Sequence, residues 1–157
     1  MLYAYEDGRA CDWQLSGGKM RVVVTGSSGF IGSHLVISLA NLGHSVLGID
    51  VKQPTQSTLT AVIHKENVQE HGLDCFSFQQ CNILDAIDFQ RALADYLPQV
   101  VIHLAAAVGV KLIVESPVRT IEENVNGTEV VLAAAAKKRK PVLLASTSEV
   151  YGDPEVG

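Results

Sequence analysis

The sequence has few of the features that mark secreted, membrane-spanning or metal-binding proteins. Only three of its 157 residues are cysteines, and they form neither a CxxC pair nor an even set. This excludes a disulfide framework and indicates a reducing, cytoplasmic setting. No apolar run approaches the roughly 20 residues of a membrane-spanning helix. The N-terminus lacks the apolar core of a signal peptide, and no histidine spacing indicates a metal site.

Positive charge is also scarce. The 12 Lys and Arg residues are outnumbered by 17 Asp and Glu, which gives a formal net charge of -5. Such a surface disfavours binding to nucleic acid or to anionic membranes, so we expect neither as a partner. The basic run at residues 137–140 is interpreted as a set of cations that complement the dipole at the end of a helix.

Glycine, by contrast, is placed regularly in one stretch, RVVVTGSSGFIGSH at residues 21–34. A β-branched run leads into Gly26, Gly29 and Gly32, and a helical pattern follows. This is the spacing of a strand–turn–helix phosphate site. The first glycine allows a tight turn, the second lets the backbone approach a pyrophosphate, and the third lets helix and strand pack closely. Asp50 ends the next expected strand, 24 residues beyond Gly26, where a carboxylate meets an adenosine ribose.

Short β-branched runs alternate with helical periodicity along the rest of the chain. The pattern predicts an α/β fold, a doubly wound parallel sheet of the Rossmann type with five strands in the order 3-2-1-4-5. Residues 1–19 show neither period and are expected to form a disordered leader before a domain over 20–157. The expected strands are 22–25, 45–50, 75–79, 100–104 and 142–145, and the clearest helices are 31–42, 85–96 and 118–138.

Five motifs in order carry a family resemblance: TGSSGFIGSHL, Asp50, HLAA at 103–106, NVNGT at 124–128 and STSEVYG at 146–152. Over residues 20–155 the chain resembles the NAD-dependent nucleotide-sugar epimerase/dehydratase family of extended short-chain dehydrogenase/reductases. The resemblance implies NAD as cofactor, a nucleotide-sugar substrate and a homodimer. It implies that the pyrophosphate is held by Gly26, Gly29, Phe30, Ile31 and Gly32, and that Asp50 binds the adenosine ribose. It also implies that Asn82 and Ile83 contact adenine and that the nicotinamide side is lined by Leu104, Ala105 and Ala106. Asn124 matches the structural asparagine of the family.

The same resemblance implies the chemistry. Members of the family oxidise the sugar C4 hydroxyl, transform the 4-keto sugar and return the hydride. Thr147 would hydrogen-bond the reacting hydroxyl, while Ser148 and Glu149 would orient a uronate carboxylate as in UDP-glucuronate decarboxylases. The segment before NVNGT is more similar to UDP-sugar 4-epimerases, so both reactions stay open. Glu149 has a structural alternative, as a carboxylate that caps loop amides.

The family's base, a tyrosine in a YxxxK motif, has no counterpart here, since Glu155 stands four residues after Tyr151. We therefore expect the chain to be the N-terminal portion of an enzyme, without turnover of its own. A non-catalytic NAD-binding sensor or scaffold is the alternative. The apolar side of the long helix, with Val125, Val130, Val131 and Ala134, is expected to meet a neighbouring subunit. His103 is interpreted as a packed core residue.

Overall fold

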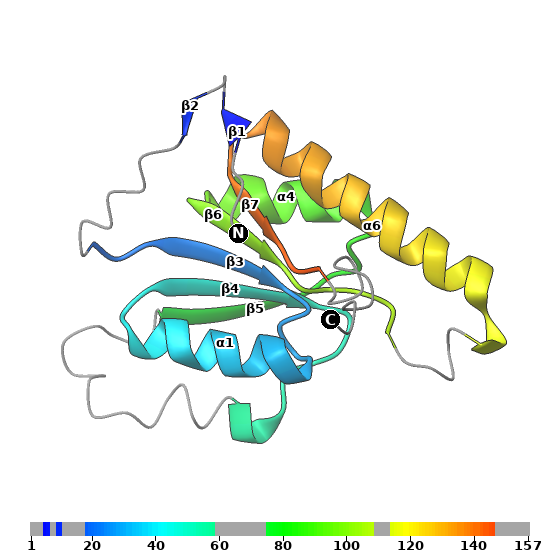
Figure 1. Cartoon of the computed structure of the whole chain (residues 1–157). Coiled ribbons are helices and arrows are strands. Elements are labelled where there is room, and N and C mark those ends of the chain that lie inside the picture. The colour runs from blue at the N-terminus through cyan, green and yellow to red at the C-terminus, as the bar shows by residue number, and fades with distance from the viewer. Residues whose placement is uncertain (1–4, 7–8, 11–17, 59–74, 109–113, 147–157) are drawn as a thin grey trace, which may run out of the picture.

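The computed structural model describes residues 5–6, 9–10, 18–58, 75–108 and 114–146. A parallel sheet with the order β5-β4-β3-β6-β7 lies at its centre (Figure 1). Read in chain order within this sheet, that arrangement is 3-2-1-4-5, so the predicted doubly wound topology is confirmed. The strands are β3 (Arg21–Thr25), β4 (Ser45–Asp50), β5 (Phe76–Gln80), β6 (Val100–His103) and β7 (Val142–Leu144).

Helices cover both faces of the sheet. On one face lies α1 (Phe30–Asn41), and on the other lie α4 (Ala86–Tyr96) and α6 (Pro117–Lys137) (Figure 1). Strand β3 serves both cores because successive side chains point to opposite faces. Val22 and Val24 pack in the cluster beneath α1, whereas Val23 packs in the cluster with residues of α4 and α6. The continuous apolar run of β3 is thus explained by burial on both sides.

Element boundaries differ from the predicted ones by a residue or so, which is ordinary at fraying ends. Two predicted signals are confirmed. Asp85 caps α4 by accepting hydrogen bonds from the Ile87 and Asp88 amides, and Gly43 follows α1 with φ +83. Within the expected leader, β1 (Tyr5–Glu6) pairs antiparallel with β2 (Arg9–Ala10). The sequence did not predict this pair, and the leader and the domain boundary at residue 20 stay predictions.

The expectation for the outer side of α6 was partly wrong. Val131 and Ala134 are buried in the core that α6 shares with the sheet, and Val130 packs against that core. Of the four residues named, only Val125 is exposed, at 60%. Helical geometry explains this, since residues three and four apart share a face. Gly127, Val131, Ala134 and Ala135 form the buried stripe.

Over the described ranges, no helix has both the length and the apolar character that crossing a bilayer requires.

Candidate functional site

The glycine turn after β3 lies where the carboxyl ends of β3, β4 and β6 meet. Gly26 has φ +71, a conformation that side chains disfavour. A Cβ at Gly26 would also stand 2.7 Å from the Ala105 amide nitrogen, which follows β6. A Cβ at Gly32 would collide with the carbonyl oxygen of Gly26. These two glycines are therefore required by the packing of the turn itself.

Gly29 differs, because the residues that the structure describes leave the space in front of it open. Among the described residues beyond its chain neighbours, an added Cβ would meet only the Gly26 carbonyl oxygen, at 3.2 Å. Gly29 is the N-cap residue of α1, and no side chain caps this helix. The amides of Phe30, Ile31 and Gly32 have no backbone acceptor in the described part of the chain. A helix N-terminus of this kind presents N–H groups and partial positive charge to an anion.

Asp50 points toward this turn. Its Oδ2 accepts a hydrogen bond from the Ser28 amide at 3.0 Å, and its Oδ1 accepts one from the Lys52 amide at 2.9 Å. Each carboxylate oxygen has a second lone pair, so the group retains capacity for two more donors. A pair of ribose hydroxyls is a donor set of that kind. The structure thus brings Asp50 to the loop, as the motif spacing predicts.

The segment after β6 forms the other wall of the turn. The Leu104 amide donates to the Thr25 carbonyl oxygen, and the Ala105 amide donates to Thr25 Oγ1 at 3.3 Å. Asn124 of α6 makes two hydrogen bonds with the backbone of Ala107. Its Oδ1 accepts from the Ala107 amide, and its Nδ2 donates to the Ala107 carbonyl oxygen. Asn124 thereby holds the 104–108 segment against α6, which agrees with the structural role implied for it.

The three residues expected to line the nicotinamide side differ in exposure and packing, and their contact with the cofactor stays a prediction. Ala105 and Ala106 are half-buried and exposed small residues in the held segment. The side chain of Leu104 instead packs against the core cluster beneath α1. The backbone of Leu104 lies at the wall, but its side chain supports the fold.

His103 is buried at 2% exposure and satisfied by hydrogen bonds on both ring nitrogens. Its Nδ1 lies 2.7 Å from Thr25 Oγ1, and its Nε2 lies 3.3 Å from Thr128 Oγ1. One assignment of donors and acceptors satisfies this whole series of hydrogen bonds. Thr25 Oγ1 accepts from Ala105 and donates to Nδ1, and Nε2–H donates to Thr128. Burial lowers the pKa of His103, which favours this neutral ring. The geometry agrees with the interpretation of His103 as a packed core residue.

Asn82 and Ile83 follow β5, the strand beside Asp50. The Cys81 amide donates to the Asp50 carbonyl oxygen, which ties this segment to the same edge of the sheet. Asn82 Oδ1 accepts from the Leu84 amide, so that oxygen is already used within its own loop. The end of the Ile83 side chain lies against Gly127 of α6, where a Cβ would stand 2.7 Å from Ile83 Cδ1. Their contact with adenine stays a prediction.

The residues expected to act on substrate, Thr147, Ser148 and Glu149, lie outside the described residues. Strand β7 leads toward them from the same edge of the sheet, since the Ala145 amide donates to the His103 carbonyl oxygen. Thiolate chemistry is disfavoured at Cys81, because burial, together with the nearby charges of Asp88 and Asp85, raises the pKa of its thiol to about 11. No cluster of three or more metal-ligating side chains occurs within the described ranges.

The sequence reasoning missed three hydroxyl residues of the site. Thr25 joins the β6 segment to His103, Ser28 joins the turn to Asp50 and Lys52, and Thr128 completes the chain from α6. The double serine within the glycine motif is a signal for Ser28, because serine in a turn commonly bonds to nearby backbone. Thr25 and Thr128 carry no such signal, since each reads as an ordinary strand or helix residue.

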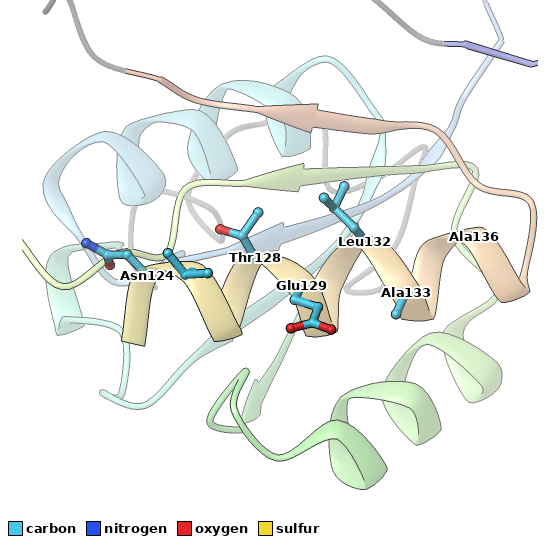
Figure 2. A pocket seen from close by; sticks show the side chains of 7 residues that line it. Asn124, Thr128, Glu129, Leu132, Ala133 and Ala136 are labelled. Atoms are coloured by element: carbon cyan, nitrogen blue, oxygen red, sulfur yellow. The ribbon is translucent and has the colours of Figure 1, made fainter. Parts of the chain in front are cut away.

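A hollow lies away from the turn, along the outer face of α6 (Figure 2). It is mainly apolar, with Thr128 and Glu129 among the polar residues at its surface. Leu132 projects from this face and is 44% exposed. Its lining residues are Asn124, Val125, Thr128, Glu129, Leu132, Ala133 and Ala136. The face is an open helix surface, separate from the glycine turn.

A parallel doubly wound sheet, a glycine turn at an uncapped helix and an acid at the end of the next strand together define a dinucleotide-binding class of α/β domain. The family model described as "NAD dependent epimerase/dehydratase family" matches residues 22–156, and the chain belongs to this family.

Relatives and solved structures agree with this assignment. The chain is 37% identical over 134 residues to UDP-N-acetyl-alpha-D-glucosaminuronate decarboxylase of Bacillus cytotoxicus, covering 85% of this chain and 38% of that protein. It is 40% identical over 139 residues to UDP-glucose 4-epimerase of Mycolicibacterium smegmatis, covering 86% and 41%. The crystal structure of UDP-glucose 4-epimerase from Brucella ovis in complex with NAD superposes with TM-score 0.70 at 30% identity, covering 87% and 38%. The chain thus spans about two fifths of these relatives' length.

Proposed function

We propose that this chain binds NAD across the glycine turn and forms the cofactor-binding portion of an enzyme acting on nucleotide sugars. One observation carries the proposal: the open N-terminus of α1 and the carboxylate of Asp50 face the same turn, tied together by the Ser28 amide. The open space at Gly29 suits a pyrophosphate at the amides of the first helical turn. Asp50 suits the adenosine ribose.

The preference for NAD over NADP follows from charge. Asp50 would hydrogen-bond the two ribose hydroxyls, whereas a phosphate on the 2′ position would meet a carboxylate at close range. When bound, NAD supplies a hydride acceptor for oxidation of the sugar C4 hydroxyl. The chain's own residues hold the pyrophosphate, select the ribose and, through Asn124 and Ala107, fix the wall where the nicotinamide would lie.

Two reactions remain candidates for the longer enzyme, since relatives that decarboxylate a uronate and relatives that epimerise at C4 match similarly well. Thr147 would contact the reacting hydroxyl in both cases. Ser148 and Glu149 favour decarboxylation, where they would orient the uronate carboxylate. We also propose a homodimer and a cytoplasmic location for the longer enzyme. A sensor or scaffold that binds NAD without turnover is the alternative.

Calorimetric titration of the purified chain with NAD tests the proposal. We expect saturable binding that Asp50→Asn weakens by roughly tenfold or more, because hydrogen bonds to a charged group are the stronger kind. Asp85→Asn is the matched control, since it removes a carboxylate from the same edge of the sheet, at the start of α4. Absence of NAD binding by the wild-type chain, or equal weakening by both variants, would refute the assignment.

Turnover provides a second test. No tyrosine in residues 1–157 has a lysine four positions later, and loss of a general base costs about 10²–10⁴-fold. We expect no conversion of UDP-glucose or UDP-glucuronate by this chain with NAD. Steady conversion by the purified chain would show that another residue acts as the base.

A further inference from the structure

Four hydrogen bonds join the glycine turn to the end of β4 and the residues after it. The Gly26 and Ser27 amides both donate to the Ile49 carbonyl oxygen, at 2.9 and 3.4 Å. The Ser28 amide donates to Asp50 Oδ2 at 3.0 Å, and Ser28 Oγ donates to the Lys52 carbonyl oxygen at 2.7 Å. Three of the four use main-chain donors that any residue would supply. Only the fourth depends on the identity of the donor side chain.

That fourth bond has a consequence for Asp50. Lys52 is the residue whose amide donates to Asp50 Oδ1 at 2.9 Å. By holding the Lys52 carbonyl oxygen, the Ser28 hydroxyl fixes the peptide segment that carries this amide. Ser28 therefore constrains both carboxylate oxygens, one directly through its amide and the other through Lys52. A carboxylate held at both oxygens cannot turn away from an incoming group.

We propose that the Ser28 hydroxyl is a positioning residue that locks the Asp50 carboxylate toward the ribose and thereby sets the selectivity for NAD over NADP. The inference rests on the proposed NAD site. With the lock in place, the carboxylate presents its remaining lone pairs to the ribose diol and repels a 2′-phosphate. Without the lock, Lys52 and Asp50 gain freedom, so the diol is bound less well and the 2′-phosphate is repelled less.

The side chain of Lys52 explains why such a lock matters in this chain. Lys52 is exposed and lies two residues after Asp50, so this end of β4 also carries a positive charge that would favour a phosphate. A locked Asp50 keeps the negative charge in front of the ribose and limits this attraction. Selectivity then depends on the geometry of the turn as well as on the acid itself.

The experiment compares Ser28→Thr with Ser28→Val, two side chains of nearly equal shape that differ in the hydroxyl. Dissociation constants for NAD and for NADP are measured by calorimetry at low salt, where the repulsion between carboxylate and phosphate is least screened. We expect Ser28→Thr to keep the wild-type ratio of the two constants and Ser28→Val to reduce the preference for NAD by roughly two- to tenfold.

The ratio distinguishes positioning from stability, because a variant that merely folds less well would lose affinity for both dinucleotides equally. Ser38→Ala is the matched control, since it removes another exposed hydroxyl bond to a carbonyl oxygen, from Ser38 Oγ to His34 O. We expect it to leave the ratio unchanged. Ser28→Ala repeats the test without an added methyl group, should thermal melting show that the valine variant unfolds.

Equal ratios for the threonine variant and for the variants without the hydroxyl would overturn the lock while leaving the NAD site in place. A wild-type chain that binds neither dinucleotide would overturn the proposed function and the lock together.

Discussion

The helices α1 and α4 begin at the same edge of the sheet, but they differ in whether a side chain caps the first backbone amides. At the start of α4, Asp85 Oδ1 accepts from the amides of Ile87 and Asp88 at 3.1 and 3.0 Å. At the start of α1, Gly29 offers no side chain, and no side chain caps the helix. A capping side chain stabilises a helix by about 1 kcal/mol relative to alanine and by a few tenths of a kcal/mol relative to glycine. The chain therefore leaves a small amount of available stability unused at α1, where we propose that an anion binds.

A similar contrast separates the two sides of the glycine turn. On the β6 side the protein satisfies its own polar groups, through Thr25, His103 and Thr128. On the α1 side, the amides of Phe30, Ile31 and Gly32 have no backbone acceptor among the described residues, and Asp50 uses two of its four lone pairs for the Ser28 and Lys52 amides. The closed regions stabilise the fold, and the open region between them is the proposed NAD site. The following substitutions test this division, beginning with the largest expected effect on stability.

Gly32→Ala should distort the open region at the glycine turn and the start of α1. The added Cβ would collide with the Gly26 carbonyl oxygen, so helix and turn must separate, at a cost of about 3 kcal/mol. Urea unfolding measures the loss. Gly29→Ala is the matched control, because its Cβ would stand 3.2 Å from the same oxygen with open space elsewhere. Equal destabilisation by the two alanines would contradict the distinction between a packing glycine and a binding glycine.

His103→Leu should weaken the closed region. It leaves the buried Thr25 hydroxyl without its acceptor, at a cost of about 2 kcal/mol. Burial lowers the pKa of His103 in the folded chain below its ordinary 6.5, so the unfolded chain binds the proton more readily. Stability from the neutral ring is full above pH 6.5 and decreases as the pH falls toward the folded-state pKa.

Urea unfolding at pH 7.5 and at pH 5.5 should therefore show an acid-induced loss in the wild type that is smaller in His103→Leu. The exposed His34 provides the control variant His34→Gln, which should keep the wild-type pH dependence. If His103→Leu loses as much unfolding free energy as the wild type between pH 7.5 and pH 5.5, then other titrating groups cause the loss.

Asp85→Ala should reduce the free energy of unfolding by about 1 kcal/mol, since it removes the cap of α4. NAD affinity should stay at the wild-type value, because the capped amides at the start of α4 are not part of the proposed NAD site. Urea unfolding and calorimetry on the same sample measure both. A clear loss of NAD affinity would mean that the start of α4 also contributes to the site.

Gly29→Ser should have the smallest effect on stability and make α1 resemble α4. Its backbone, at φ -72 and ψ 173, accepts serine, and a serine cap improves on glycine by only a few tenths of a kcal/mol. The new side chain would occupy the open space and compete for the amides. We therefore expect slightly higher stability with weaker NAD binding, and a gain in both would contradict the assignment of this space to a ligand.

Local patterns were sufficient to predict much of this protein. The alternation of short strand-like runs with helical periodicity predicted the five parallel strands, and the continuous apolar runs of β3 and β4 reflect burial on both faces. Gly26, Gly29 and Gly32 predicted the turn, and Asp85 and Gly43 predicted helix ends. Each of these features depends on residues close together in the chain, so the sequence carries the signal directly.

The failures concern side-chain direction. Val131 and Ala134 were expected on the open side of α6, yet both side chains are buried in the core between α6 and the sheet. The side chain of Leu104 packs against the core cluster beneath α1, and its place at the cofactor wall stays a prediction. An apolar residue on a helix or after a strand indicates burial somewhere. The docking of one element on another decides where.

The sequence by itself determined the order of strands and helices, the glycine turn and the charge of the residue at position 50, because these follow from local conformational preference and composition. Only the tertiary structure decided that Asp50 is held from two sides by Ser28 and Lys52, and that Thr25, His103 and Thr128 form one buried chain. Apart from the bond between Lys52 and Asp50, two residues apart, those contacts join residues 22 to 78 positions apart. Their geometry exists only once the sheet and its helices have packed.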